Sequence, residues 1–281
     1  MTVYFEGEGG VRLAADAEGP WTGRPVVLLH GGGQTRHSWG GTSRALAERG
    51  YLAIALDARG HGDSDWSKDS DYSIDAYAAD LRSVLRQLGR PAALVGASLG
   101  GLTALLACGE EPRVDGTALV LVDVTPRMRE DGRQRIGDFM RARPEGFASL
   151  EEAADAVSAY MPNRPRPKDV SGLAKNLRLG EDGRYRWHWD PAFLEGTSLM
   201  RTTSEPRRFE AAAAAVSLPM LLVRGSVSEI VADEDVAALR AVAPAMEFVD
   251  VEGAGHMVAG DRNDVFAAAA IGFLERTYPH L

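Results

Sequence analysis

Ser98 stands in a setting that favours nucleophilic chemistry. It is the centre of a Gly-x-Ser-x-Gly motif at residues 96–100, which follows the apolar run 92–95 and leads into a helical pattern at 99–108. Small residues beside the serine allow the sharp, strained turn that leaves its hydroxyl exposed at a strand end. The N-terminus of the following helix favours negative charge that develops there. The motif therefore predicts that Ser98 is a nucleophile.

A second glycine-rich segment ends another apolar run. Residues 30–33, His-Gly-Gly-Gly, directly follow the run 26–29. Glycines at a strand end let backbone N–H groups point into a cavity, where two of them can hold an oxyanion. We expect the N–H groups of Gly32 and Leu99 to form this oxyanion hole, and we interpret His30 as a structural residue.

A general base is predicted near the C-terminus. His256 follows a glycine-rich turn after the apolar run 247–251, and none of the other five histidines has such a position. Its place downstream of Ser98 agrees with a triad in the order serine, acid, histidine. We therefore expect His256 to take the proton of Ser98.

Two carboxylates are candidates for the acid that orients this histidine. Asp123 directly follows the apolar run 118–122, and Glu229 comes soon after the run 220–223. A short carboxylate at a strand tip suits a fixed hydrogen bond to Nδ1–H of a histidine. The sequence therefore favours Asp123 and leaves Glu229 as the alternative.

The elements that must position these residues alternate along the chain. Helical patterns separate short apolar runs, several of them apolar throughout, as expected for strands that are buried on both faces. These runs are residues 26–29, 52–56, 92–95, 118–122, 220–223 and 247–251. The alternation predicts a mostly parallel sheet with helices on both faces. Residues 4–17 alternate in polarity around Gly9-Gly10 and predict an antiparallel hairpin at the sheet edge.

The alternation is interrupted once, between residues 126 and 215. This stretch has no strand-like run, and it holds 7 of the 14 prolines and 16 of the 31 basic residues. It carries a net charge of +2, whereas the rest of the chain carries −11. Helical patterns at 134–142 and 150–160 are separated by proline-rich turns. We predict a core formed by residues 1–125 and 216–281, and a helical cap at 126–215.

Composition excludes several classes of protein. The formal charge is −9 and the isoelectric point is near 5.2, which is opposite to the basic surface of a nucleic-acid binder, so we expect no nucleic acid as a partner. The single cysteine, Cys108, cannot form an intrachain disulfide, as is typical of a reducing compartment. Residues 1–8 show no signal-peptide pattern, and no apolar run approaches the ~18–20 residues of a membrane span. We expect a cytoplasmic protein with no membrane partner.

Together the motifs resemble those of the α/β-hydrolase family. The segments 30–33, 59–64 (Arg-Gly-His-Gly-Asp-Ser), 96–100 and 255–256 stand in the family's order and at its distances. The resemblance implies an eight-stranded, mostly parallel sheet, a helical cap at 126–215 and a site beneath that cap. It also implies catalysis without a cofactor or a metal. The family commonly places its acid at the position of Ser228, one residue before Glu229, although some members take it from the earlier strand, as Asp123 would be.

The resemblance also implies a range of reactions. A serine hydrolase of this kind cleaves an ester, a lactone or a related activated carbonyl bond of a small organic substrate, through an acyl-enzyme. The chain is similar to enol-lactonases and to C–C hydrolases. A C–C bond hydrolase, a perhydrolase or a lyase on the same triad remains an alternative, as does a ligand-binding receptor on this fold. Serine as the nucleophile argues against haloalkane dehalogenase and epoxide hydrolase chemistry, which uses an aspartate there.

The predicted cap offers candidates for substrate binding. Trp187, His188 and Trp189 are consecutive in a short aromatic segment. They either line the cleft or hold the cap together. The basic excess of the cap further suggests that an arginine there meets a carboxylate of the substrate.

Overall fold

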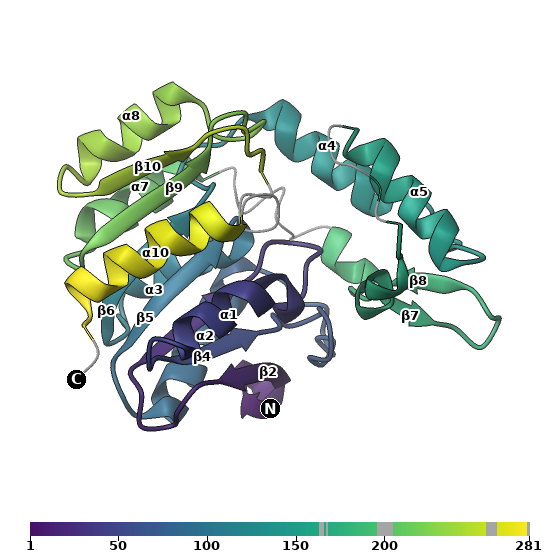
Figure 1. Ribbon diagram of the computed structural model, residues 1–281, viewed down its shortest axis with the longest axis horizontal. Helices are drawn as coiled ribbons and strands as arrows, with labels where there is room; N and C mark the ends of the chain where they lie inside the picture. The colour runs from purple at the N-terminus through teal and green to yellow at the C-terminus, as the bar shows by residue number, and fades with distance from the viewer. Residues whose placement is uncertain (163–165, 167, 196–204, 257–262, 280–281) are drawn as a thin grey trace.

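The computed structural model describes the chain except residues 163–165, 167, 196–204, 257–262 and 280–281 (Figure 1). Its centre is an eight-stranded sheet in the order β1-β2-β4-β3-β5-β6-β9-β10. The six strands from β4 to β10 in this order run parallel, and β1 and β2 are antiparallel. This confirms the predicted mostly parallel sheet. The strands are Thr2–Glu6 (β1), Arg12–Glu18 (β2), Pro25–Leu29 (β3), Leu52–Leu56 (β4), Ala92–Ala97 (β5), Gly116–Val122 (β6), Met220–Gly225 (β9) and Glu247–Val251 (β10).

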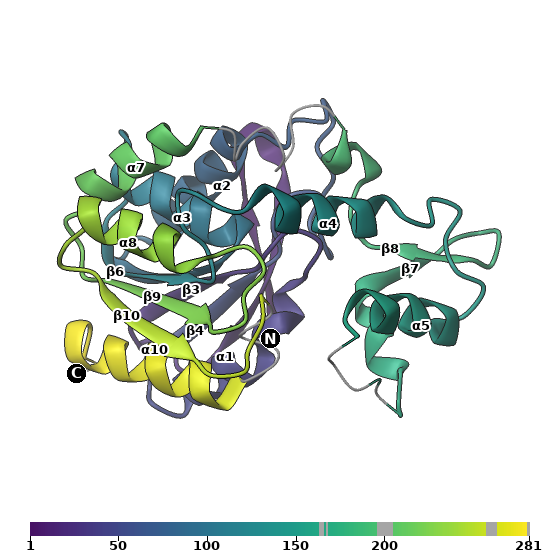
Figure 2. The same ribbon diagram turned by 90° about the horizontal axis from the view of Figure 1, so that it is seen from above.

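Helices cover both faces of the sheet because the central strands bury side chains on both sides. In β3, Val26 and Leu28 belong to one apolar cluster, and Val27 and Leu29 to the other, as the alternation of side chains along a strand requires. Helices α1 (Gly40–Ala47) and α10 (Asn263–Thr277) cover the first face. On the second face lie α2 (Ile74–Leu88), α3 (Leu99–Gly109), α7 (Pro206–Ala215) and α8 (Asp233–Val242) (Figure 2).

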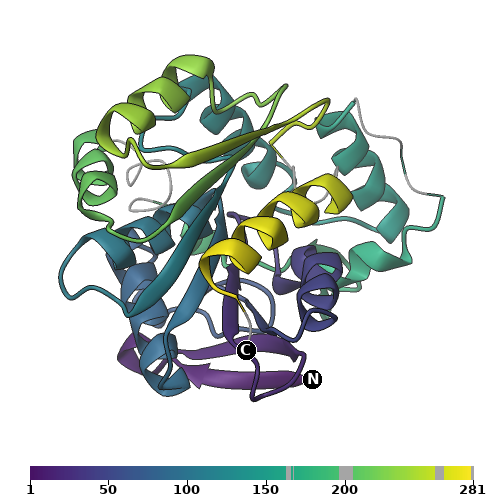
Figure 3. The ribbon, with the colours of Figure 1, turned by 60° about the vertical axis from the view of Figure 1, so that its left-hand side comes forward.

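The predicted hairpin is confirmed at the edge of the sheet, and a serine caps the helix α2. The N-terminal hairpin pairs β1 with β2 from Thr2–Asp16 to Glu6–Arg12 and lies at the sheet edge, while the yellow helix α10 crosses one face (Figure 3). Ser73 caps α2, since its side chain accepts a hydrogen bond from the N–H of Ala76, which satisfies one free donor of the first turn.

A separate unit lies beside the core and contains α4 (Glu130–Arg141), α5 (Leu150–Tyr160) and the short helices Ser171–Asn176 (η3) and Pro191–Leu194 (η4). It also contains a small antiparallel pair, β7 (Leu177–Leu179) with β8 (Tyr185–Trp187). The prediction that residues 126–215 contain no strand is therefore wrong. Strands of three residues are too short to produce an alternation that can be recognised in the sequence.

Helix α7 closes the predicted cap range but lies with the core (Figure 1). Phe209, Ala212 and Ala213 are buried in the core cluster, and a Cβ on Gly109 of α3 would collide with the backbone of Ala212. The chain has thus returned to the core before residue 215.

In the described part of the chain, no helix combines the length and the apolar character that crossing a membrane requires.

Candidate active site

Ser98 occupies the turn between β5 and α3. Its backbone has φ 46° and ψ −114°, a conformation that side-chain-bearing residues rarely adopt and that is often found at functional sites. The turn is possible because a glycine stands two residues away on each side: a Cβ on Gly100, for example, would collide with the carbonyl of Leu29. The Ser98 hydroxyl makes no capping hydrogen bond with α3, so it is not engaged by the helix that it begins.

Asp123 and His256 are brought together at the same edge of the sheet. Nδ1 of His256 lies 2.8 Å from Oδ2 of Asp123, although the two residues are 133 positions apart. The Asp123 carboxylate is fully buried and accepts two further hydrogen bonds, from the N–H of Gly225 (3.1 Å) and from the hydroxyl of Ser228 (2.7 Å). Three donors therefore fix the carboxylate that faces the histidine.

Glu229, the alternative acid, points away from this pair. About half of its side chain is exposed, and it forms an ion pair with Arg135 of α4 at 3.0 Å. Ser228, at the family's usual acid position, instead donates to Asp123. This role of Ser228 was not predicted from the sequence, although its position relative to the strand was the available signal.

The glycine-rich segment after β3 lies against Ser98. A Cβ on Gly31 would be 3.3 Å from Cβ of Ser98. Within the described residues, the N–H groups of Gly32 and Leu99 have no hydrogen-bond acceptor. Both are free to donate to an oxygen that develops negative charge beside Ser98.

Three buried histidines hold this segment in place. His30 accepts from the N–H of Ala58 (3.0 Å), His61 from that of Gly33 (3.1 Å) and His188 from that of Gly62 (2.8 Å). Each second ring nitrogen faces a backbone carbonyl oxygen, those of Gly31, Arg59 and Gly33 respectively. One nitrogen of each ring must therefore accept while the other donates, which only the neutral imidazole can do.

The surroundings of these rings keep them neutral. Burial lowers the pKa of His30 and lowers that of His61 well below its ordinary value, and neighbouring histidines add to the effect at His61. Burial also lowers the pKa of His188 to about 3, with His30 contributing. These histidines act as structural bridges of the loops around Ser98, as expected for His30.

The structure places the predicted substrate-binding residues of the cap elsewhere. Trp187 and Trp189 stack on each other, with ring centroids 5.0 Å apart and planes 11° apart. Trp187 also contacts Phe139 and Phe147. Of the described residues, those that line the cavity at Ser98 include none of Trp187, His188 and Trp189. The expectation that they line the cleft is not supported, because the two tryptophans stack on each other, Trp189 also lies beside Gly33, and His188 bonds to core loops.

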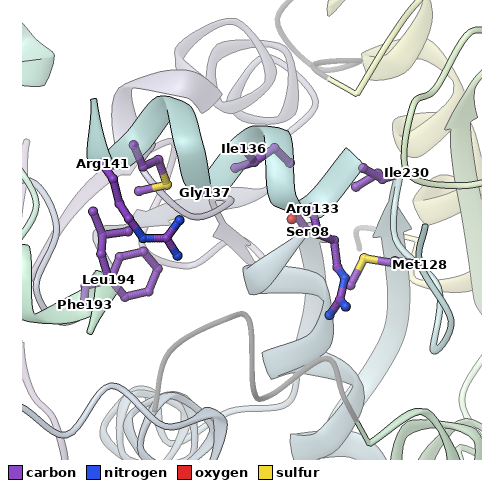
Figure 4. A pocket seen from close by; sticks show the side chains of 10 residues that line it. Ser98, Met128, Arg133, Ile136, Gly137, Arg141, Phe193, Leu194 and Ile230 are labelled. Atoms are coloured by element: carbon purple, nitrogen blue, oxygen red, sulfur yellow. The ribbon is translucent and has the colours of Figure 1, made fainter. Parts of the chain in front are cut away.

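The cavity at Ser98 lies beneath one face of α4 (Figure 4). Residues 133, 136, 137, 140 and 141 recur at helical spacing and line it from above. Its described lining consists of Ser98, Met128, Arg133, Ile136, Gly137, Met140, Arg141, Phe193, Leu194 and Ile230. The helix was predicted from the sequence, but the face of the helix that meets the site was not.

No metal centre accompanies this arrangement among the described residues, where no group of three or more His, Cys, Asp or Glu side chains is placed to hold an ion. The site combines a serine, a histidine–carboxylate pair and two backbone N–H groups that lack an acceptor among the described residues.

Comparison with known proteins identifies the family. The profile of the Alpha/beta hydrolase family matches residues 26–269. The chain belongs to the alpha/beta hydrolase family. Esterase Rv0045c of Mycobacterium tuberculosis is 35% identical to this alpha/beta hydrolase over 244 residues, which are 84% of this chain and 78% of that esterase. A 2-(acetamidomethylene)succinate hydrolase of Mesorhizobium japonicum is 30% identical over 236 residues, 82% of this chain and 80% of that hydrolase.

Solved structures agree with this assignment. The M. tuberculosis esterase Rv0045c superposes with a TM-score of 0.74 at 29% identity, over 98% of this chain and 92% of the other. The crystal structure of E-2-(acetamidomethylene)succinate hydrolase gives a TM-score of 0.85 at 24% identity, over 98% and 99% of the two chains, which shows a shared fold. This alpha/beta hydrolase is thus a hydrolase by family and a homologue of an esterase.

Proposed function

We propose that this alpha/beta hydrolase is a serine hydrolase that cleaves an ester, a lactone or a related activated carbonyl bond of a small organic substrate through an acyl-enzyme. The observation that carries the proposal is the 2.8 Å contact between His256 Nδ1 and the buried Asp123 carboxylate, at the edge of the sheet where Ser98 lines a cavity. The identity with an esterase supports the same reaction class.

The steps follow from the geometry. With Nδ1–H held by Asp123, Nε2 of His256 is the nitrogen that takes the proton of Ser98 as Oγ attacks the carbonyl carbon. The N–H groups of Gly32 and Leu99 stabilise the negative oxygen of the tetrahedral intermediate. The intermediate collapses as His256 gives the proton to the leaving oxygen, and a water activated by His256 then releases the acid from Ser98.

The proposal includes a carboxylate-bearing substrate. One relative is named for its hydrolysis of a succinate derivative, and the range 126–215 has a net charge of +2 in a chain whose net charge is −9.

Product analysis distinguishes ester cleavage from C–C cleavage, perhydrolysis or a lyase reaction on the same residues.

The test of this function is the variant Ser98→Ala. Loss of the nucleophile in a serine triad lowers kcat on the order of 10⁶-fold, so turnover of a 4-nitrophenyl ester should fall to background. A fluorophosphonate should add its mass to the wild type and not to the variant. Ser158→Ala, on α5, serves as the matched control. Retention of a tenth of wild-type activity by Ser98→Ala would exclude the covalent mechanism.

A further inference from the structure

Two of the described residues that line the cavity are arginines, and of these only Arg133 has buried nitrogen atoms without a hydrogen-bond partner. Only a tenth of its side chain is exposed, and its Nε and Nη1 atoms are buried with no hydrogen-bond partner. The remaining nitrogen, Nη2, contacts the carboxylate of Glu130, which is two-thirds exposed. A buried polar group without a partner costs free energy, and more so when it is charged. The orphaned donors therefore indicate a place where an anionic group of a ligand can accept hydrogen bonds.

Neighbouring arginines of the same helix are accounted for without a ligand. Arg135 pairs with Glu229 and donates to the carbonyl of Tyr160. Arg141 is 43% exposed and forms an ion pair with Asp138. Arg133 differs from both because burial removes water from its guanidinium, which lowers its pKa, and no protein group replaces that water at Nε and Nη1.

The cavity joins this cation to the nucleophile. Ser98 and Arg133 line the same space (Figure 4). On α4, Arg133 lies one helical turn before Gly137, which also lines the cavity. Most of the other lining side chains are apolar: Met128, Ile136, Met140, Phe193, Leu194 and Ile230. The cavity thus fits an apolar body that carries a reactive carbonyl and a single charged group.

We infer that Arg133 binds a carboxylate of the substrate while Ser98 attacks its ester carbonyl, so that the enzyme selects half-esters of dicarboxylic acids over neutral esters. This inference rests on the proposed function of Ser98. The carboxylate accepts hydrogen bonds from the donors of Arg133 that have no protein partner, and no bond to Arg133 forms or breaks. A single negative charge suits the site better than a phosphate dianion, because Glu130 already offsets part of the guanidinium charge.

The first experiment compares two substrates of equal chain length, mono-4-nitrophenyl glutarate and 4-nitrophenyl pentanoate. A hydrogen bond to a charged group is strong enough to change kcat/KM tenfold to a hundredfold, so the wild type should prefer the glutarate by at least about tenfold. Arg133→Met should reduce this ratio to about one by slowing the glutarate, while Arg133→Lys should keep part of the preference. Arg135→Met, on the same helix and outside the cavity, should keep the wild-type ratio.

The second experiment measures the contribution of Arg133 to binding in the absence of turnover. Calorimetry should show that Ser98→Ala binds glutaramate, a monoanion, more tightly than the neutral pentanamide of equal chain length, and that adding Arg133→Met or Arg133→Lys weakens this selectivity in the same order as in the kinetics. This holds whether or not Ser98 is the nucleophile, so failure of the proposed function and failure of the inference remain distinct. Equal rates of the wild type on both esters would overturn the inference, as would an unchanged ratio in Arg133→Met. If Arg133→Met does not fold, an unchanged ratio in Arg133→Lys together with equal binding of glutaramate and pentanamide would overturn it.

Discussion

The role of Asp123 depends on the hydrogen bonds that fix its carboxylate in place. Its carboxylate receives hydrogen bonds from Gly225 N–H and Ser228 Oγ besides facing Nδ1 of His256. Such a fixed acceptor selects the histidine tautomer that carries its proton on Nδ1 and leaves Nε2 free to accept. Glu229 has no such support, since it is half exposed and paired with Arg135.

The first prediction compares these two carboxylates. Asp123→Asn should lower kcat by about 10⁴, because an amide can hold His256 in the wrong tautomer, as it does in the serine-protease template. Glu229→Gln should lower kcat less than about tenfold. Steady-state kinetics on one ester measures both, after circular dichroism has established that the variants fold. The opposite order of the two losses would transfer the acid role to Glu229.

Helix α4 is the element that shapes the cavity. Its inner face carries Arg133, Ile136, Gly137, Met140 and Arg141, and its outer face is polar, which gives the helix its amphipathic character. Gly137 contributes no side chain, and a Cβ there would meet only the flexible end of Arg141. The missing side chain therefore leaves room in the cavity rather than permitting a close backbone contact.

The second prediction concerns the size of this space. Gly137→Leu should fill part of the cavity, so kcat/KM for a 4-nitrophenyl hexanoate should fall about tenfold or more relative to the acetate. This corresponds to losing roughly two buried methylenes at about 0.8 kcal/mol each. Gln134→Leu, on the exposed side of α4, is the control and should leave the hexanoate-to-acetate ratio unchanged. If both variants gave the wild-type ratio, the acyl chain would not lie along α4.

At the scale of the whole molecule, hydrogen bonds join the unit of α4, α5 and the β7–β8 pair to the core loops. His188 bridges the backbone of Gly62 and Gly33, and the N–H of Asp190 donates to the carbonyl of Gly60 at 2.9 Å. The segment after β8 is therefore tied to the loop that presents the candidate oxyanion donors. The neutral side chain of His188 therefore couples the folding of the unit that contains α4, α5 and the β7–β8 pair to the order of the loops at the site.

The third prediction is a pH dependence of stability. The pKa of His188 is about 3 in the folded chain and near 6.5 when unfolded, so the unfolded chain binds the extra proton between these values. The unfolding free energy contributed by this residue is complete above about pH 6.5 and is lost as pH falls, by about 2 kcal/mol at pH 5. Arg178 and Asp63 are the charged groups nearby and influence the pKa in opposite directions.

Urea unfolding at pH 7 and pH 5 measures this contribution. His188→Gln keeps a donor and an acceptor but does not titrate, so its loss of stability between the two pH values should be smaller than that of the wild type by about 2 kcal/mol. Titration of carboxylates elsewhere affects both proteins alike and cancels in the difference. Equal losses in the two proteins would show that His188 is not held neutral.

Features that depend on neighbours along the chain were determined by the sequence itself. Uniformly apolar runs predicted the central strands because burial on both faces leaves no polar position in them. The Gly-x-Ser-x-Gly motif predicted a strained turn at Ser98 because only small flanking residues permit it, and the structure has that turn. The parallel direction of the central strands and the edge hairpin follow from similar local patterns.

Features that depend on distant contacts were decided by the tertiary structure. The sequence favoured Asp123 as the acid but left Glu229 open, because the answer depends on distant contacts. Asp123 meets His256, which is more than a hundred residues away in the chain, whereas Glu229 meets Arg135. Aromatic side chains such as Trp187 and Trp189 are typical of the lining of a binding cleft, yet here their rings stack on each other. Arg133 was one of 16 basic residues in the range 126–215. Only packing shows that its donors are buried beside the Ser98 cavity without a partner, because burial is a property of the folded chain and not of the residue.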